Sequence, residues 1–349
     1  MSNVLIYGAN GYTGALIARE AVARGMPAVL AGRNPEALAA LGQELQVAHR
    51  VFTLDDPAAV EAGIHGVTVV LNCAGPFRHT WRPIADACLR TRAHYLDITG
   101  EIAVFEALAA RDAQAKAAGV LLLPGVGFDI VPSDCLAAHL KQRLPSATHL
   151  ALGIQSLSRT SRGTALTIAE NMHHGGLIRR NGVLKQVPAA WKTRVISFGA
   201  GPVKAITIPW GDVASAYYST RIPNIEVYMA APLALRVAMR ASRFLGWALA
   251  SSFVQEFVKK RIRAGPPGPT AEERALRKSY LWGEVTDSAG NKAEARLQGP
   301  EAYSFTVRTA LAVVERVLAG QTPVGFHTPS MAFGPDFVLH VEGTVRADA

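Results

Sequence analysis

The sequence contains little cysteine and little charge. Its 349 residues include three cysteines, and Asp, Glu, Lys and Arg together make up 18% of the chain. Cys73, Cys88 and Cys135 are odd in number and lack metal-ligand spacing, which argues against a disulfide scaffold and a cysteine-based metal site and predicts a reducing cytoplasm. Apolar residues nevertheless make up 49%, so the chain can bury a full core, and its length favours two domains.

Targeting and membrane-spanning segments are also missing from the pattern. No basic and then apolar leader precedes the first apolar stretch, so we expect no secretory signal. The uncharged run between Arg243 and Glu256 is shorter than the roughly 20 apolar residues that cross a bilayer. The net charge is +9, but no basic run is interleaved with aromatic residues. Nucleic acid is therefore the least favoured partner, after acidic small molecules and anionic membrane surfaces.

The clearest motif that is present is a set of three glycines spaced three apart. Residues 4–7 predict a buried strand, residues 8–14 read Gly-Ala-Asn-Gly-Tyr-Thr-Gly, and an amphipathic helix follows at once. Glycine allows close approach to a ligand, and the helix N-terminus offers N–H groups to a pyrophosphate. This context favours dinucleotide binding over a turn without a ligand. The spacing G-x-x-G-x-x-G leaves open which glycine faces the phosphates.

The residue after the second expected strand, 28–31, indicates the type of coenzyme. No Asp or Glu occurs between Glu20 and Glu36, and Arg33 lies about 20 residues beyond the glycine turn. An acidic side chain there would bind the ribose of NAD, whereas a guanidinium accommodates the 2′-phosphate of NADP. We therefore predict NADP(H); a solvated surface arginine is the alternative.

Strand and helix patterns alternate through about residue 125. Further strands are expected at 47–52, 67–72, 94–98 and 120–124, and helices begin at Asn34-Pro35 and Asp56-Pro57 and cover 84–90 and 103–118. This alternation predicts a Rossmann-type, doubly wound parallel sheet in an α/β fold. The small residues Ala74-Gly75-Pro76-Phe77, at the carboxyl end of the fourth strand, would let the coenzyme cross the sheet edge.

The pattern changes from about residue 148. Strand-like stretches at 150–156, 193–198, 204–209, 279–286 and 292–297 are accompanied by helical stretches at 165–172 and 302–318. We predict an α+β domain for substrate binding or dimerisation over residues 131–324. It would be inserted into an NADP-binding domain over residues 1–130 that residues 325–349 complete.

Five segments resemble the saccharopine dehydrogenase-like NADP-binding oxidoreductases. They are Gly8-Ala-Asn-Gly-Tyr-Thr-Gly14, Ala31-Gly-Arg33, Asn72-Cys-Ala-Gly-Pro-Phe77, Tyr95-Leu-Asp-Ile-Thr-Gly-Glu101 and Gly125-Val-Gly-Phe-Asp129. The chain looks closer to the branch of trans-acting enoyl reductases and membrane-associated saccharopine dehydrogenase-like proteins than to true saccharopine reductases. The latter have an Asp-Pro-Gly type turn where this sequence has Gly127-Phe128-Asp129.

The resemblance implies NADPH as coenzyme and adds the fifth strand end to the predicted site. The predicted coenzyme-binding residues are Gly8, Asn10, Gly11, Tyr12, Thr13, Gly14, Arg33, Ala74, Gly75, Pro76, Phe77, Asp97, Gly100 and Glu101. No metal site is predicted.

The catalytic group is less clearly indicated. Reduction of C=C, C=O or C=N leaves negative charge on the acceptor, so a positioned acid or hydrogen-bond donor lowers the barrier. Asp129 and Tyr303 are the candidates, and the pair His173-His174 is another. Each of them could instead serve structure, and Asp134 is better explained as a helix cap.

These observations predict an NADPH-dependent oxidoreductase for a hydrophobic, unsaturated (enoyl) or carbonyl substrate, carrier- or CoA-linked. An imine-type reductase of an amino-acid-linked substrate is the alternative within enzymes. A lipid-surface protein that keeps the nucleotide fold without turnover is the alternative outside them, and a redox sensor is a third possibility.

Two stretches bear on partners. Residues 233–262 predict an amphipathic helix whose polar stripe follows positions 236, 240, 243, 251, 255 and 259. Core or homodimer packing is the first interpretation, and peripheral contact with a lipid surface is the second. Residues 171–211 contain no acidic residue, so they could attract an acidic carrier-bound substrate or form a solvated basic face.

Overall fold

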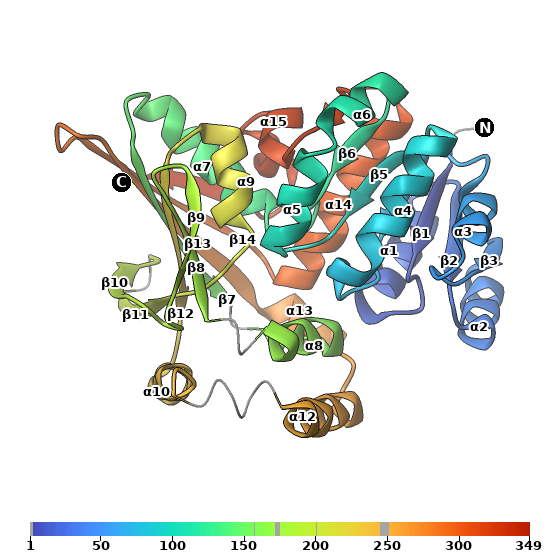
Figure 1. Cartoon of the computed structure of the whole chain (residues 1–349), viewed down its shortest axis with the longest axis horizontal. Helices are drawn as coiled ribbons and strands as arrows, with labels where there is room; N and C mark the ends of the chain where they lie inside the picture. The colour runs from blue at the N-terminus through green and yellow to red at the C-terminus, as the bar shows by residue number, and fades with distance from the viewer. Residues whose placement is uncertain (1–2, 157, 172–174, 200, 245–250) are drawn as a thin grey trace. The chain divides into compact units, whose positions relative to one another are not determined.

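A computed structural model of the chain describes residues 3–156, 158–171, 175–199, 201–244 and 251–349. The chain divides into two compact units. The first unit consists of Met1–Asp129 and Tyr303–Ala332, and the second of Ile130–Ala302 and Phe333–Ala349. Figure 1 follows both units along the chain.

The first unit contains a seven-stranded sheet in the order β15-β6-β5-β4-β1-β2-β3, flanked by helices (Figure 1). Every pairing within it is parallel. The strands are β1 (Val4–Tyr7), β2 (Ala28–Gly32), β3 (His49–Val51), β4 (Val69–Asn72), β5 (His94–Asp97), β6 (Leu121–Leu123) and β15 (Gly325–Phe326). This is the predicted doubly wound arrangement. The order reverses between β1 and β4, where open α/β sheets bind their ligands.

The helices of the first unit follow the expected signals closely. They are α1 (Tyr12–Ala23), α2 (Pro35–Leu45), α3 (Pro57–Ile64), α4 (Phe77–Thr91), α5 (Ile102–Ala109), α6 (Asp112–Ala118) and most of α14 (Ala302–Leu318). The Asn34 and Asp56 side chains accept hydrogen bonds from the first turns of α2 and α3, as predicted. The single helix expected over 103–118 is wrong. The chain turns at Arg111 into α6, where Asp112 accepts a hydrogen bond from the Phe326 N–H in β15, 2.9 Å away.

The second unit is built on a mixed sheet in the order β10-β11-β12-β7-β13-β14-β16, with β8 and β9 attached to β12. The strands are β7 (His149–Ser156), β8 (Gly176–Arg180), β9 (Val183–Val187), β10 (Thr193–Ser197), β11 (Pro202–Thr207), β12 (Asn224–Ala230), β13 (Lys278–Thr286), β14 (Lys292–Pro300) and β16 (Val345–Asp348). The sequence patterns did not predict β8, β9, β12 and β16.

Helices of the second unit cover one face of this sheet (Figure 1). The helices on that face are α7 (Val131–Arg143) and α9 (Asp212–Thr220). The other helices of the unit are α8 (Arg162–Asn171), α10 (Leu233–Ala241), α12 (Ser252–Ala264) and α13 (Ala271–Leu276). At Gly283 a Cβ would lie 2.6 Å from Leu140 Cδ1, so the glycine lets α7 approach β13 closely.

The expected boundary near the C-terminus needs correction. Residues 325–349 were predicted to complete the first domain, but Ala295 of β14 pairs with Asp348 of β16 in the second sheet. Asp348 also binds His139 of α7, with Oδ1 2.8 Å from Nε2. The first unit is instead completed by Tyr303–Ala332, which includes a helix that the prediction gave to the inserted domain.

Candidate functional site

The turn between β1 and α1 lies at the carboxyl edge of the first sheet, beside the end of β4. Gly8 has φ +79°, and its N–H donates to Ala31 O over 2.8 Å. A Cβ on Gly8 would lie 2.9 Å from Ala74 N, and a Cβ on Gly14 would lie 2.3 Å from Gly8 O. The fold therefore requires both outer glycines, because backbone packs directly on backbone there.

Gly11, the middle glycine, is under less internal constraint. It is exposed, its φ of −73° suits any L-residue, and a Cβ there would meet Gly8 O at 3.2 Å. It precedes α1, which has no side-chain cap at this position and no acidic residue in its first turn. The lack of a side chain at Gly11 thus keeps the positive end of the helix open to an anion.

The end of β2 lies next to this turn. A Cβ on Gly32 would stand 3.2 Å from Asn10 Oδ1, which brings the exposed Asn10 to the tip of the strand. Arg33 follows and is exposed, and no hydrogen bond or ion pair joins it to another residue in the described part of the chain. Its charge opposes the effect of burial on Tyr7, where burial dominates and raises the pKa to about 12.

Hydrogen bonds with two side chains, Asn72 and Thr80, hold the loop after β4 in place. The buried Asn72 side chain accepts a hydrogen bond from Ala74 N over 3.0 Å and donates to Thr80 Oγ1 over 3.1 Å. Thr80 in turn donates to Ala74 O over 2.7 Å. The loop contains a cis peptide bond between Gly75 and Pro76, and Gly75 is exposed. Residues 74–77, which the sequence predicted at the coenzyme, are therefore fixed beside Gly8.

Two of the predicted coenzyme residues have internal partners. The Glu101 carboxylate accepts hydrogen bonds from Phe77 N over 2.7 Å and Arg78 N over 3.0 Å, so it caps α4. Asp97 is fully buried and accepts hydrogen bonds from the N–H groups of Thr99 and Gly125 and from the Tyr95 hydroxyl group. Its burial raises the pKa to about 6. Both side chains hold the site's loops in place, and direct coenzyme contact by either stays a prediction.

The candidate proton donors lie at the ends of neighbouring segments of the first unit. Asp129 is partly exposed and contacts the Gly100 backbone, where an added Cβ would be 3.0 Å from Asp129 Oδ2. Desolvation raises the pKa of Asp129 to about 7, within the range of a neutral-pH acid or base. The ring of Tyr303 stands edge-on to that of Tyr12, at the start of α1, with centroids 5.1 Å apart.

Helix α14 positions this part of the site, a role that no sequence pattern predicted. Thr306 Oγ1 accepts a hydrogen bond from Phe128 N over 3.0 Å, and Thr309 Oγ1 donates to Val126 O over 2.8 Å. Two threonines one turn apart thus fix the loop 125–128 beneath Asp129. Their sequence separation from that loop is close to 180 residues, so no local pattern could reveal the contact.

Comparison with known proteins identifies the domain that carries this site. Residues 4–123 match the saccharopine dehydrogenase NADP binding domain. The resemblance expected from the sequence is therefore confirmed, as is NADP as the coenzyme of this domain. A helix N-terminus open behind Gly11 and an uncommitted arginine at the end of β2 fit a coenzyme with a pyrophosphate and an additional phosphate.

Several relatives with assigned names match part of this chain. A trans-acting enoyl reductase of Mycobacterium ulcerans is 29% identical over 184 residues, which cover 48% of this chain and 44% of the relative. A probable mitochondrial saccharopine dehydrogenase-like oxidoreductase of Arabidopsis thaliana is 33% identical over 152 residues, covering 38% and 33%. The human saccharopine dehydrogenase-like oxidoreductase is 27% identical over 163 residues, covering 41% and 38%. The matched regions thus span less than half of each relative.

A solved structure extends the likeness in fold to the second unit. Apo saccharopine dehydrogenase (L-Glu forming) from Saccharomyces cerevisiae aligns over 100% of both chains with a TM-score of 0.66 and 10% identity. At this identity the match concerns the fold. The NADP-binding domain and the second sheet therefore follow the architecture of that enzyme.

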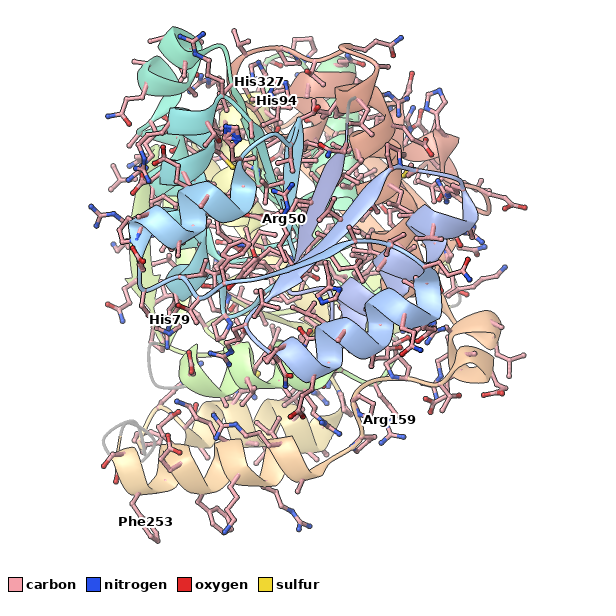
Figure 2. All side chains as sticks on the ribbon, turned by 90° about the vertical axis from the view of Figure 1, so that its right-hand side faces the viewer. Arg50, His79, His94, Arg159, Phe253 and His327 are labelled. Atoms are coloured by element: carbon pink, nitrogen blue, oxygen red, sulfur yellow. The ribbon has the colours of Figure 1, made fainter. Side chains whose placement is uncertain are left out.

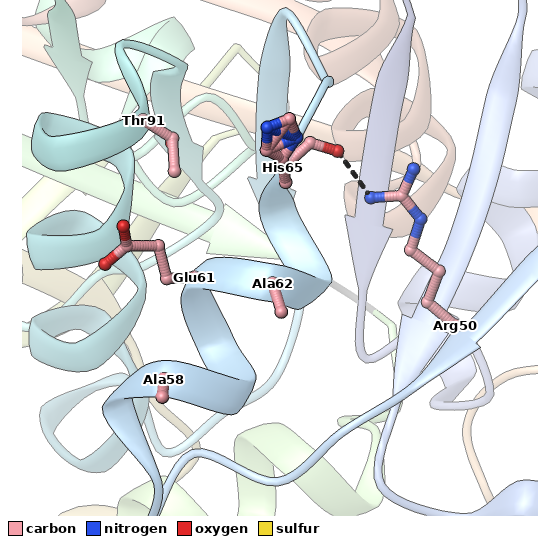
Figure 3. A pocket seen from close by; sticks show the side chains of 6 residues that line it. All are labelled: Arg50, Ala58, Glu61, Ala62, His65 and Thr91. Atoms are coloured by element: carbon pink, nitrogen blue, oxygen red, sulfur yellow. Dashed lines mark hydrogen bonds between the residues drawn. The ribbon is translucent and has the colours of Figure 1, made fainter.

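A hollow of about 720 Å³ on the NADP-binding domain is separate from the site (Figure 3). It runs along one face of α3 and is lined by Arg50, Ala58, Glu61, Ala62, His65 and Thr91. Arg50 donates to His65 O over 2.9 Å across it. None of these residues belongs to the glycine turn, the tip of β2 or the end of β4, so the hollow does not contribute to coenzyme binding.

Other predicted features fall outside this site. The pair His173-His174 and residues 245–250 of the amphipathic segment lie outside the described residues. The described residues contain no group of three side chains able to hold a metal ion. In the basic stretch 171–211, Arg179 is buried and donates to Val213 O, while Lys192 and Arg194 pair with Glu226 and Glu284. Three of the six basic side chains in this stretch therefore bind partners within the second unit.

The amphipathic segment corrects one expectation. Core or homodimer packing was the first interpretation of residues 233–262, and core packing is wrong, because neither α10 nor α12 has a buried residue. Polar side chains attach this segment to the unit: Arg240 of α10 donates to Thr193 Oγ1 over 2.8 Å, and Arg243, just after the helix, donates to Ala189 O and Ala190 O, each over 2.7 Å. Met239 of α10 packs against the buried Ala190 and Ile206, but other apolar side chains are exposed: Leu233 by 67% and Val237 by 57% in the helix, and Phe244 by 82% just after it.

Helix α12 likewise contacts the unit through polar side chains and exposes apolar ones. Its polar Gln255 and Lys259 bind α8, through Ala169 O at 3.1 Å and Glu170 Oε1 at 3.2 Å respectively. Phe253 and Phe257 are 80% and 65% exposed. Phe253 points away from the rest of the second unit in Figure 2. No helix among the described residues is long and apolar enough to cross a membrane.

Proposed function

We propose that this protein is an NADPH-dependent oxidoreductase that reduces a hydrophobic, carrier- or CoA-linked substrate at an activated C=C or C=O bond. The observation that carries the proposal is the meeting of three parts at one sheet edge: the open glycine turn, the uncommitted Arg33 and the fixed loop after β4. The names of the trans-acting enoyl reductase relatives support the choice of an unsaturated substrate.

The protein's own residues have separable tasks in this proposal. NADPH supplies a hydride when bound. Gly11 and the start of α1 hold the pyrophosphate, and Arg33 holds the 2′-phosphate. Asp129, whose pKa of about 7 leaves it partly protonated near neutral pH, gives a proton to the reduced substrate, or Tyr303 donates a hydrogen bond to it. The second unit contributes the substrate-binding surface.

Coenzyme binding and turnover test this proposal in sequence. NADPH should bind with at least tenfold higher affinity than NADH, measured by fluorescence titration. NADPH oxidation should then be followed with enoyl thioesters, ketoacyl thioesters and an imine formed from an amino acid. If only the imine were reduced, the protein would instead be an imine reductase of an amino-acid-linked substrate. NADPH binding without turnover of any acceptor would favour a protein that keeps the nucleotide fold for another purpose.

We also propose that α10 and α12 attach the protein peripherally to a lipid surface. An amphipathic helix in a water-soluble protein normally turns its apolar face inward, whereas both of these helices expose several large apolar side chains. Basic residues accompany the exposed phenylalanines of α12, with Lys260, Arg261 and Arg263 in its last two turns. Such a surface would bring the enzyme to a membrane-dissolved or long-chain substrate.

Flotation with phospholipid vesicles tests the attachment, and a matched pair of variants gives it specificity. Phe253→Ser with Phe257→Ser should abolish flotation without lowering the melting temperature, because neither side chain is buried. Ile168→Ser removes another exposed apolar side chain from the same unit and should leave flotation unchanged. The face would instead be a dimer interface if the wild type did not float and if light scattering showed a dimer for the wild type but a monomer for the phenylalanine variant.

A further inference from the structure

The second unit contains a pocket of about 340 Å³ between the start of α8, the end of α12 and the turn that follows α12. Its lining includes three arginines from two segments: Arg159 and Arg162 at the start of α8, and Arg261 in α12. Thr160, Ala165, Ile262, Gly265 and Pro266 complete the lining. Arginines from segments about 100 residues apart are thus gathered around one space.

The pocket carries an excess of positive charge. Arg162 Nε donates to Gly265 O over 2.8 Å, a bond to a neutral carbonyl that leaves its charge unbalanced. Arg159 NH1 lies 3.8 Å from Glu273 Oε1, while Glu273 Oε2 accepts a hydrogen bond from Thr270 N in the cap of α13. Arg261 forms no ion pair within the described ranges of the chain. Three guanidinium groups therefore face one carboxylate that is already engaged.

Guanidinium groups arranged in this way suit a phosphate. Each presents parallel N–H donors whose spacing matches two phosphate oxygens, and a bound anion relieves their mutual repulsion. The bond from Arg162 to Gly265 and the hydrogen bond from Arg162 N to Pro267 O, 3.0 Å, fix the pocket wall in advance. Binding would then require the ordering of Arg159 and Arg261 alone.

The surroundings indicate where the phosphate comes from. Phe253, Phe257 and Arg261 follow one another at intervals of four along α12, so the two exposed phenylalanines and the pocket arginine share one face of the helix. In Figure 2 Phe253 lies at one end of α12 and Arg159 beside the other. A ligand that offers a phosphate next to an apolar phase matches this face, whereas a free phosphate ester would make no use of the phenylalanines.

We propose that the three-arginine pocket binds the phosphate of an anionic phospholipid headgroup at the surface that α12 contacts. This inference rests on the proposed lipid attachment and adds a specific headgroup site to it. A phosphate monoester, as in phosphatidic acid, presents more phosphate oxygens to the pocket than a phosphodiester such as phosphatidylserine does. Binding should therefore discriminate between these lipids even when the vesicles carry the same surface charge.

The test is flotation of the full chain with phosphatidylcholine vesicles that contain phosphatidic acid or phosphatidylserine, matched in zeta potential. The wild type should bind the phosphatidic acid vesicles about tenfold more tightly. Arg159→Gln with Arg261→Gln should abolish this preference. Lys260→Gln with Arg263→Gln also removes two positive charges, but from positions outside the pocket. This variant should bind both kinds of vesicle more weakly and keep the ratio of the two affinities. Equal melting temperatures of the two double variants verify that both are folded.

Each remaining outcome overturns the inference in a distinguishable way. Binding to both anionic vesicles without preference, or a preference that survives Arg159→Gln with Arg261→Gln, would reject the headgroup site and leave the lipid attachment intact. No binding to any vesicle would reject the attachment and the site together. If phosphate stabilised the wild type but not the pocket variant against heat, with sulfate as the salt control and without vesicle binding, the ligand would be a soluble phosphate ester.

Discussion

Arg33 is exposed at the end of β2, and the described part of the chain gives it no ionic partner. Its replacement by alanine should weaken NADPH binding roughly 10- to 100-fold, since a charge-assisted hydrogen bond contributes about 1.5 to 3 kcal/mol. NADH lacks the 2′-phosphate and should bind as before. Fluorescence titration of both coenzymes measures the difference. Arg19→Ala, which removes an exposed arginine paired with Glu44, is the control. An equal loss for NADPH and NADH would reject the assignment of Arg33.

The middle and last glycines of the turn should respond differently to a methyl group. Gly11→Ala fits the backbone and should leave the melting temperature nearly unchanged, yet it should weaken NADPH binding about tenfold or more because the methyl group occupies the anion's approach. Gly14→Ala places a Cβ 2.3 Å from Gly8 O and should destabilise the fold by about 1–3 kcal/mol. Thermal melts with and without NADPH separate the two effects. A Gly11→Ala variant with unaltered NADPH affinity would move the pyrophosphate elsewhere on the turn.

Asp129 should leave a signature in the pH dependence of stability. Its pKa is about 7 in the folded protein against the ordinary value of 3.8, so between these values the folded state holds a proton that the unfolded state has lost. The contribution of Asp129 to the free energy of unfolding therefore falls as the pH rises from about 4 to about 7. Urea unfolding at pH 5 and pH 8 should show a larger loss in the wild type than in Asp129→Asn. Parallel profiles would mean that Asp129 ionises normally.

At the scale of elements, α14 reaches the coenzyme domain from the far end of the chain. Thr306→Val removes the acceptor of the buried Phe128 N–H and should destabilise the protein by about 1–3 kcal/mol, measured by chemical unfolding. Thr306→Ser keeps the oxygen and loses the methyl group beside Gly127, so it should retain most of the stability. If serine and valine were equally harmful, packing rather than the hydrogen bond would position the loop.

The elements themselves were predictable where a local signal specifies them. The glycine turn, the Asn34-Pro35 and Asp56-Pro57 helix starts and the apolar stretches correctly predicted the strands β1 to β6 of the first sheet but not β15. The strands β8, β9, β12 and β16 and the threonine contacts of α14 were not predicted, because partners distant in sequence determine them. The exposed apolar side chains of α10 are a further example: periodicity showed that the helix is amphipathic, but it could not show which face meets the protein.

At the scale of the whole molecule, the two units share the C-terminal region unequally. Deletion of residues 344–349 removes β16 and exposes the edge of β14. We expect the second unit to lose stability, seen as an earlier transition in a thermal melt, while NADPH affinity stays within about twofold of the wild type, since β15 and α14 remain. A large loss of NADPH binding would show that the tail supports the coenzyme domain, as the sequence first suggested.

The return of the chain to the first sheet also sets an order of events during synthesis. Strand β6 ends at Leu123, and its outer neighbour β15 begins at Gly325, about 200 residues later. At 5–20 residues per second, the ribosome needs on the order of 10–40 s to deliver that strand. Throughout this interval the nascent sheet has an unpaired edge and its last loop has no threonine anchors. The inserted unit is thus translated while the coenzyme fold is still incomplete, which makes this interval the period of greatest exposure to misassembly and chaperones.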